Sequence, residues 1–327
     1  MNLPSTDERR DAVWPGQWTA RVPLGGLLPR LPAGRRDAAV AALNGLLGDH
    51  LHELGHPLAW PMQVRSGTRW LVPDGADLAL GSATGHVLVL LHGVCRSDRG
   101  WRHDGHDPGI ALQRLLGVTP LHARYNSGRH VADNGRALAL LLERLLSRWP
   151  VPVHTVSIVG HGLGGLVARS AALEGLGMAW RPALRHLVFI ATPHLGLPLA
   201  QAGHWLHRVF DLCPYTGPYS RLSGLRSAGL MDLQAGRVRE PGHDGPVPLP
   251  TDVLAFAMAG TIGSPEMEGS RHSDGLVSLD SALGDDADPA RCLGIPDARR
   301  WIGEGMHYLE LQSHPRLLRP MLQCLQE

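Results

Sequence analysis

Residues 154–169 combine an apolar strand pattern, a glycine-rich turn and a helix pattern. This layout is typical of the nucleophile elbow, G-x-S-x-G, in which a serine occupies a strained turn and small flanking residues let the strand and helix approach each other. Gly160 and Gly164 provide the flanking positions, but the central position is Gly162. A glycine has no side chain that could attack an acyl group, so the turn lacks the nucleophile that this chemistry needs.

The same turn matches the dinucleotide-binding pattern G-x-G-x-x-G through Gly160, Gly162 and Gly165. That use of the pattern requires an acidic residue about 20 residues later, at the end of the next strand. The next apolar strand ends in residues 189–193, which contain no carboxylate. The sequence therefore disfavours a nucleotide site, while a purely structural turn stays open as an alternative.

A second candidate element is the dipeptide His92-Gly93, which follows the apolar strand pattern of residues 86–91. Acyl-transfer enzymes place one backbone N–H of the oxyanion hole at such a position and the other directly after the nucleophile. We expect these two donors to be the N–H groups of Val94 and Leu163.

Further acid and base candidates lie downstream. Asp274 occurs in the segment SDGLV, and His307 and Tyr308 occur in the segment GMHYLELQS. The chain order is therefore turn, acid, base, which is the order expected for an elbow of this kind.

With these residues in place, the chain resembles α/β-hydrolase-fold lipases and esterases, near the bacterial triacylglycerol lipases, from Gly85 to the C-terminus. The resemblance rests on five motifs in order: VLLHGV, VGHGLGG, ATPHLG, SDGLV and GMHYLELQS. It implies an α/β-hydrolase fold, a carboxylic ester hydrolase reaction and a small acyl or ester-type ligand. It also implies that Asp274 is the acid of the catalytic triad and that residues 195–250 form a lid.

Two positions depart from this family. Gly162 stands where the family has its serine. Alignment on Leu309 and Glu310 places Tyr308 at the position of the family's catalytic histidine, and His307 then lies one residue before that position. A phenol with a pKa of about 10 keeps its proton at neutral pH and is a poor base. Whether His307 or Tyr308 faces the site is left open by the sequence.

These departures predict a lipase-like homologue that is catalytically impaired or inactive. Loss of a triad member leaves a residual acceleration of roughly 10³-fold from binding and the oxyanion hole. The alternative is a protein that binds a ligand or partner in the vacated acyl pocket. Cys95 is a possible substitute nucleophile, although a buried apolar role is commoner, and His161 is expected to pack or hydrogen-bond at the turn.

Another alternative is a zinc hydrolase, because His52, Glu53 and His56 form the pattern H-E-x-x-H. On a helix this pattern places two histidines on one face for zinc, with the glutamate as base. Gly55 and Pro57 weaken a helix here, and no third ligand is evident. We therefore expect no metal and no other cofactor.

The composition excludes some chemistry. All 31 basic residues are arginine, against 30 acidic residues, for a net charge of +1. Without lysine, Schiff-base chemistry and the P-loop are excluded. The nearly equal numbers of basic and acidic residues argue against nucleic acid or another polyphosphate partner.

The four cysteines are scattered, and neither a signal peptide nor a run of 18 apolar residues is present. We expect a cytoplasmic protein without a transmembrane segment.

The alternation of strand and helix patterns predicts an α/β fold: a mostly parallel sheet with helices on both faces, an N-terminal helical extension and a lid insertion. We expect an extension over residues 1–84 and a hydrolase domain over 85–327. The expected strands are 86–91, 120–125, 154–159, 184–190 and 253–259. The expected helices are 37–54, 110–116, 132–149, 163–176, 205–212 and 314–325.

Overall fold

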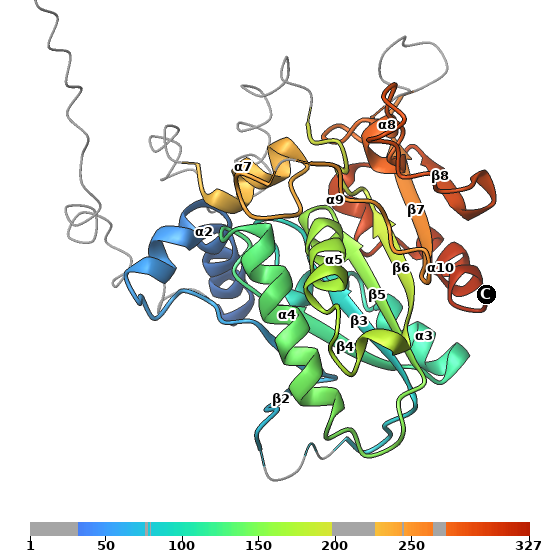
Figure 1. Ribbon diagram of the computed structural model, residues 1–327. Coiled ribbons are helices and arrows are strands. Elements are labelled where there is room, and N and C mark those ends of the chain that lie inside the picture. The colour runs from blue at the N-terminus through green and yellow to red at the C-terminus, as the bar shows by residue number, and fades with distance from the viewer. Residues whose placement is uncertain (1–31, 76–77, 79, 198–225, 244, 264–272) are drawn as a thin grey trace, which may run out of the picture.

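The computed structural model describes residues 32–75, 78, 80–197, 226–243, 245–263 and 273–327. Its centre is an eight-stranded sheet in the order β2-β1-β4-β3-β5-β6-β7-β8 (Figure 1). The two strands β1 and β2 are antiparallel to their neighbours, and the other six are parallel to one another. The strands are β1 (Gln63–Ser66), β2 (Arg69–Leu71), β3 (His86–Leu91), β4 (Thr119–Arg124), β5 (Thr155–His161), β6 (Leu184–Ile190), β7 (Leu254–Thr261) and β8 (Arg300–Glu304).

Helices cover both faces of this sheet, as expected for parallel strands made of nearly continuous apolar residues. In Figure 1, α4 (Val131–Leu146) and α5 (Leu163–Glu174) lie side by side in front of the sheet. The helix α3 (Pro108–Leu116) lies behind it and contacts α10 (Leu318–Cys324). The remaining helices are α2 (Ala33–Glu53), α7 (Ala228–Ala235), α8 (Leu279–Leu283) and α9 (Tyr308–Leu311).

The structure confirms the predicted mostly parallel sheet with helices on both faces. The strands β3 and β6 have the predicted bounds, whereas β1, β2 and β8 were not expected. These three strands are short and carry polar residues, so their sequences lack the apolar pattern of a buried strand. Because β1 and β2 belong to residues 1–84, part of the expected extension is continuous with the sheet.

The expected lid falls largely outside the described residues. Residues 198–225, which include the helix expected at 205–212, are not described. The described end of that insertion contains α7, which contacts α2. Within the described part of the chain, no helix is long and apolar enough to cross a membrane, and Cys95, Cys292 and Cys324 are free thiols.

The start of α5 lies very close to the end of β3. A Cβ on Gly164 would lie 2.5 Å from the carbonyl oxygen of Leu91 and 2.7 Å from that of His92. A Cβ on Gly160 would in turn lie 2.5 Å from the backbone of Gly164. Both glycines of the predicted elbow are therefore required by backbone contacts that no larger residue could make.

We expect Gly164→Ala to lower the free energy of unfolding by about 1–3 kcal/mol, because the added methyl group must push two backbone segments apart. The measurement is urea unfolding followed by circular dichroism. Gly81→Ala is the matched control, since a Cβ at Gly81 meets no atom within 4 Å. Equal stability of the two variants would show that α5 does not pack against β3 as described.

Candidate functional site

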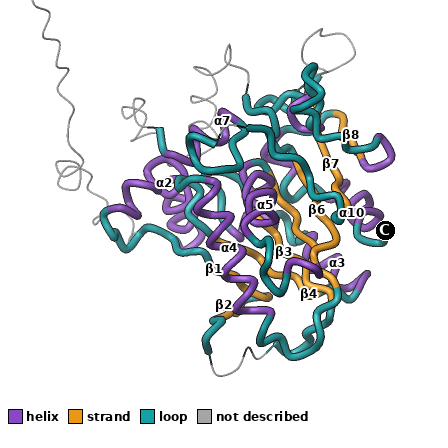
Figure 2. The backbone as a smooth tube through the Cα atoms, viewed as in Figure 1, coloured by secondary structure: helices purple, strands orange, loops and turns teal. Residues whose placement is uncertain are grey.

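The candidate site lies where several parallel strands end at one edge of the sheet (Figure 2). Gly93 follows β3, Gly162 follows β5, Asp274 follows β7, and Tyr308 follows β8. The carboxyl ends of parallel strands meet at one edge, which is the usual place for ligand and catalytic sites in open α/β sheets. The structure thus brings together residues that lie up to 215 positions apart in the sequence.

Gly162 forms a sharp turn with φ 53° and ψ −117°. Its N–H donates to the carbonyl oxygen of Ile190 at 2.8 Å, and its own carbonyl oxygen accepts from the N–H of Gly165 at 3.1 Å. The helix α5 begins at the next residue. A positive φ is strained for a residue with a Cβ but not for glycine. The backbone is that of the predicted elbow, without its side chain.

Tyr308 fills the space that a side chain at the elbow would need. A Cβ placed on Gly162 would lie 1.9 Å from Tyr308 Oη. The Tyr308 side chain is only 3% exposed, and its ring lies 4.5 Å from the His161 ring. Tyr308 Oη is also close to the loop that follows β3, since a Cβ on Gly93 would lie 3.1 Å from it. The phenol group therefore lies between that loop and the elbow.

The neighbouring His307 points elsewhere. Its side chain is exposed, and its ring lies beside Gly275, where an added Cβ would be 3.2 Å from His307 Nδ1. His307 precedes α9 as its N-terminal cap, and its N–H donates to Glu310 Oε2 at 3.4 Å. Of the two residues left open by the sequence, Tyr308 is the one beside the elbow.

Asp274 is buried, with 1% of its surface exposed. Its Oδ1 accepts hydrogen bonds from the N–H groups of Leu276 and Val277 at 2.9 and 2.7 Å. Its Oδ2 has no hydrogen-bond partner among the described residues. Burial raises the pKa of Asp274 to about 7, and the two backbone N–H groups offset only part of that rise.

The chemistry of tyrosine explains why Asp274 Oδ2 has no hydrogen-bond partner in the described part of the chain. An imidazole has two ring nitrogens, so one can meet a carboxylate while the other reaches the elbow. A phenol has one polar atom, at the far end of the ring, and Tyr308 Oη also has no hydrogen-bond partner among the described residues. Burial, and then the charge of Asp274, raise the pKa of Tyr308 above its ordinary value, so its hydroxyl stays protonated.

The two histidines at the site are neutral. His161 Nε2 donates to the carbonyl oxygen of Tyr308 at 2.9 Å, and burial, followed by the charge of Arg96, lowers the pKa of His161 to about 3. Burial lowers the pKa of His92 to about 4, and its ring stacks on that of Tyr125 at 4.2 Å. His161 therefore has the packing and hydrogen-bonding position that its place in the turn suggested.

The expected oxyanion-hole residues directly follow Gly93 and Gly162, the two glycines that lie close to Tyr308 Oη. Val94 follows Gly93 and is buried, and Leu163 is the first residue of α5. The N–H groups at the start of a helix have no intrahelical partner. Their use as an oxyanion hole stays a prediction.

Cys95 directly follows Val94 and lies close enough to Tyr308 to add to the rise in pKa that burial causes there, whereas the H-E-x-x-H pattern lies at the end of α2. Cys95 Sγ is 3.9 Å from the carbonyl oxygen of Ala42, so the thiol packs against α2. The helix α2 ends at Glu53, which places His56 beyond the helix, where its Nδ1 accepts from the N–H of Leu58. Among the described residues no group of three or more histidine, cysteine or acidic side chains could hold a metal ion.

No family model matches the chain, and no curated protein matches it by sequence. Among solved structures, it is similar to the lipase BlEst2 of Bacillus licheniformis in its mature form, with 16% identity and a TM-score of 0.50 over 79% of this chain and 97% of that one. It is also similar to the esterase Pf2001 of Pyrococcus furiosus, with 16% identity and a TM-score of 0.44 over 81% and 88% of the two chains.

At such identities the likeness concerns the fold and not the activity. The sheet order, the turn between β5 and α5, and the match to the Bacillus lipase agree with one another. The chain adopts the α/β-hydrolase fold of lipases and esterases.

Proposed function

We propose that this protein is a pseudohydrolase, an α/β-hydrolase-fold protein that acts by binding and does not hydrolyse esters through a covalent intermediate. One observation carries the proposal. The hydroxyl of Tyr308 occupies the space of the nucleophile side chain, 1.9 Å from where a Cβ of residue 162 would be. A serine and this tyrosine conformation exclude each other.

The nucleophile and the base of acyl transfer both lack their chemical groups. Gly162 supplies no nucleophile. Tyr308 has a pKa raised above its ordinary value, so it does not accept a proton at neutral pH. A water molecule in place of the serine would need a base, and the exposed His307 faces Gly275 instead.

The same contact bears on the alternative of an acyl ligand in a vacated pocket. Such a ligand would place its carbonyl group beside Gly162, between the elbow and the loop that follows β3. Tyr308 Oη lies in that space, and its ring belongs to the hydrophobic core. We therefore propose that the region beside the elbow is packed core, and that ligand binding takes place elsewhere on the fold.

We predict that wild-type protein does not hydrolyse p-nitrophenyl acetate above the rate of a heat-unfolded sample. Gly162→Ser and Tyr308→His are each expected to stay inactive, because the first variant lacks a base and the second lacks a nucleophile. The double variant regains both groups next to Asp274. We expect it to exceed each single variant by at least about 10-fold, or about 1.4 kcal/mol in the barrier. The measurement is the initial rate at pH 8.

Asp274→Asn in the double variant should remove the regained activity, and Gly81→Ser serves as a control for an added serine elsewhere. Wild-type turnover that Asp274→Asn or Tyr308→Phe abolishes would contradict the proposal, because it would show that these side chains catalyse a reaction without Gly162 bearing a nucleophile.

A second prediction concerns the carboxyl group of Asp274, which has no base to orient. The pKa of Asp274 is about 7 in the folded protein, against about 3.9 for an unperturbed aspartate. Between pH 4 and 7 the folded state therefore holds a proton that the unfolded state has lost, so this group makes the wild type less stable as the pH rises. Asparagine cannot ionise. The stability of Asp274→Asn relative to wild type should rise over that window, by roughly 4 kcal/mol at most.

The measurement is urea unfolding of both proteins at pH 5 and pH 8. Taking the difference between the two proteins cancels the buried histidines, which titrate in both. Asp280→Asn, at an exposed aspartate, is the control and should show no such change. A constant difference between Asp274→Asn and wild type would mean that Asp274 is already ionised at pH 5.

A further inference from the structure

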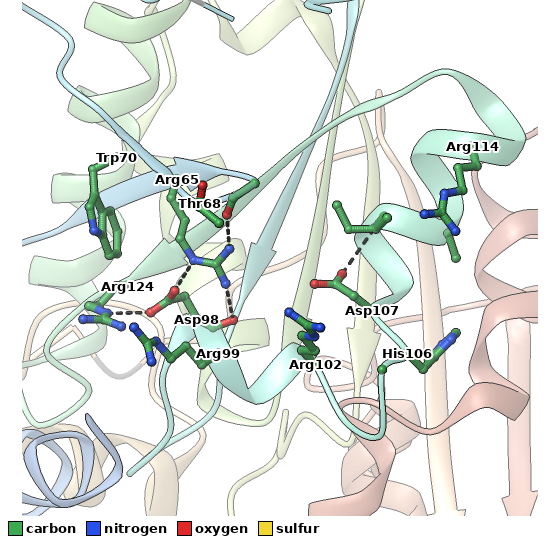
Figure 3. A pocket seen from close by; sticks show the side chains of 14 residues that line it. Arg65, Thr68, Trp70, Asp98, Arg99, Arg102, His106, Asp107, Arg114 and Arg124 are labelled. Atoms are coloured by element: carbon green, nitrogen blue, oxygen red, sulfur yellow. Dashed lines mark hydrogen bonds and ion pairs between the residues drawn. The ribbon is translucent and has the colours of Figure 1, made fainter. Parts of the chain in front are cut away.

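A cavity of about 810 Å³ lies outside the elbow, between the antiparallel strands β1 and β2, the end of β4 and the start of α3 (Figure 3). The short 3₁₀ helix η3 (Asp98–Trp101) also contributes to its wall. The cavity does not contain Gly162, Asp274 or Tyr308. Its charged lining residues are Arg65, Arg99, Arg102, Arg114, Arg124, Asp98 and Asp107.

Two of the five arginines are paired with a buried carboxylate. Asp98 is 1% exposed and accepts from Arg65 Nε, and from Arg124 Nε at 2.5 Å. Burial alone would raise the pKa of Asp98, but Arg65 and Arg124 outweigh it and lower the pKa, so the carboxylate is ionised. Arg124 also pairs with Asp37 at 2.7 Å. These groups form a rigid, internally neutralised wall.

The second carboxylate is occupied by its own neighbours. Asp107 Oδ1 accepts from the N–H groups of Gly109 and Ile110 at 2.9 and 3.2 Å. The same oxygen lies 3.2 Å from His122 Nε2. Asp107 thus caps the start of α3 and is not paired with an arginine of the cavity.

The other three arginines have no counter-ion among the residues that the structure describes. Within the described part of the chain, the side chains of Arg99, Arg102 and Arg114 make no hydrogen bond or ion pair, and all three are exposed. In Figure 3, Arg102 stands between the Asp98 group and Asp107, with Arg99 on one side and Arg114 on the other. Arg99 in η3, Arg102 directly after it and Arg114 in α3 therefore line one hollow.

This arrangement concentrates positive charge in a protein that is almost neutral as a whole. The chain has 30 acidic residues for 31 arginines, yet none of the described ones pairs with these three. An excess of one sign of charge in a cleft focuses the field and attracts ions of the opposite sign. Guanidinium groups match phosphate oxygens with paired, parallel N–H donors.

We propose that this cavity binds a small organic molecule that carries two phosphate groups, as in a diphosphate ester. In a diphosphate ester the terminal phosphate carries about −1.5 to −2 charges at neutral pH and the internal phosphate about −1, so together they balance the three arginines. The volume is within the range of about 300–1,000 Å³ found for small-molecule sites. Ile110, Ala111 and Trp70, which also line the cavity, would contact the organic part. The near-zero net charge of the chain disfavours binding of an extended polyanion. It does not reflect the local excess of positive charge in this cavity.

The test is isothermal titration calorimetry of the full chain at low ionic strength with inorganic pyrophosphate, orthophosphate and citrate as probes. We expect pyrophosphate to bind at least 10-fold more tightly than orthophosphate or citrate, and its affinity to fall as salt is added. Arg102→Gln and Arg114→Gln should each weaken pyrophosphate binding by at least 10-fold.

Arg185→Gln is the matched control, because Arg185 is exposed at the start of β6 and does not line the cavity. It should leave the affinity unchanged, and equal melting temperatures would show that all variants are folded. No binding of pyrophosphate at millimolar concentration would overturn the proposal. Citrate binding as tight as that of pyrophosphate, or an equal loss in Arg185→Gln, would overturn it as well.

Discussion

The space beside Gly162 can hold one group only, and that group is the hydroxyl of Tyr308. This steric constraint determines the rest of the site. The tyrosine ring packs against His161, whose N–H is bonded to the tyrosine carbonyl oxygen. The backbone N–H of Tyr308 donates to the carbonyl oxygen of Asp274 at 3.0 Å. The ends of β5, β7 and β8 are thereby joined through one side chain and its backbone.

Burial of this cluster has an electrostatic consequence. Removing an ionisable group from water disfavours its charged form, unless a partner of opposite charge compensates. In a hydrolase of this fold, an imidazole beside the acid provides such a partner during the reaction. Among the described residues, Asp274 has no cation or side-chain donor, and burial raises its pKa to about 7 while lowering that of His161 to about 3. At neutral pH, His161 and Tyr308 are therefore uncharged, and Asp274 is about half ionised.

The cavity near β1 and β2 has the opposite character. There the buried Asp98 is compensated by two arginines, and additional arginines remain exposed to solvent. A cluster of paired and exposed arginines thus lies in this cavity, away from Gly162. The overall composition, with almost equal numbers of acidic and basic residues, averages over these two regions and could not distinguish them.

The fold was largely predictable because the parallel strands are long, apolar and separated by amphipathic helices. The strands β1, β2 and β8 were missed because their residues are mixed. They are strands through pairing of β1 with β4, of β2 with β1 and of β8 with β7. The motifs also located Gly162, Asp274 and Tyr308 at one end of the sheet. The direction of the Tyr308 side chain could not be predicted, because a shift of one residue in a loop exchanges Tyr308 and His307. The sequence signal for this contact was the combination of the smallest residue, Gly162, at one position of the triad with a large residue, Tyr308, at another.

That pairing is asymmetric. Tyr308 in its present conformation requires a residue without a Cβ at position 162, since any Cβ would collide with Oη. Gly162 does not require Tyr308, because glycine tolerates φ 53° with any neighbour. A serine at position 162 would therefore have to displace the phenol group from the core before it could fit. The present side-chain packing at the elbow depends on both residues. Gly162 is compatible with other residues at position 308, whereas Tyr308 in this conformation is compatible only with glycine at position 162.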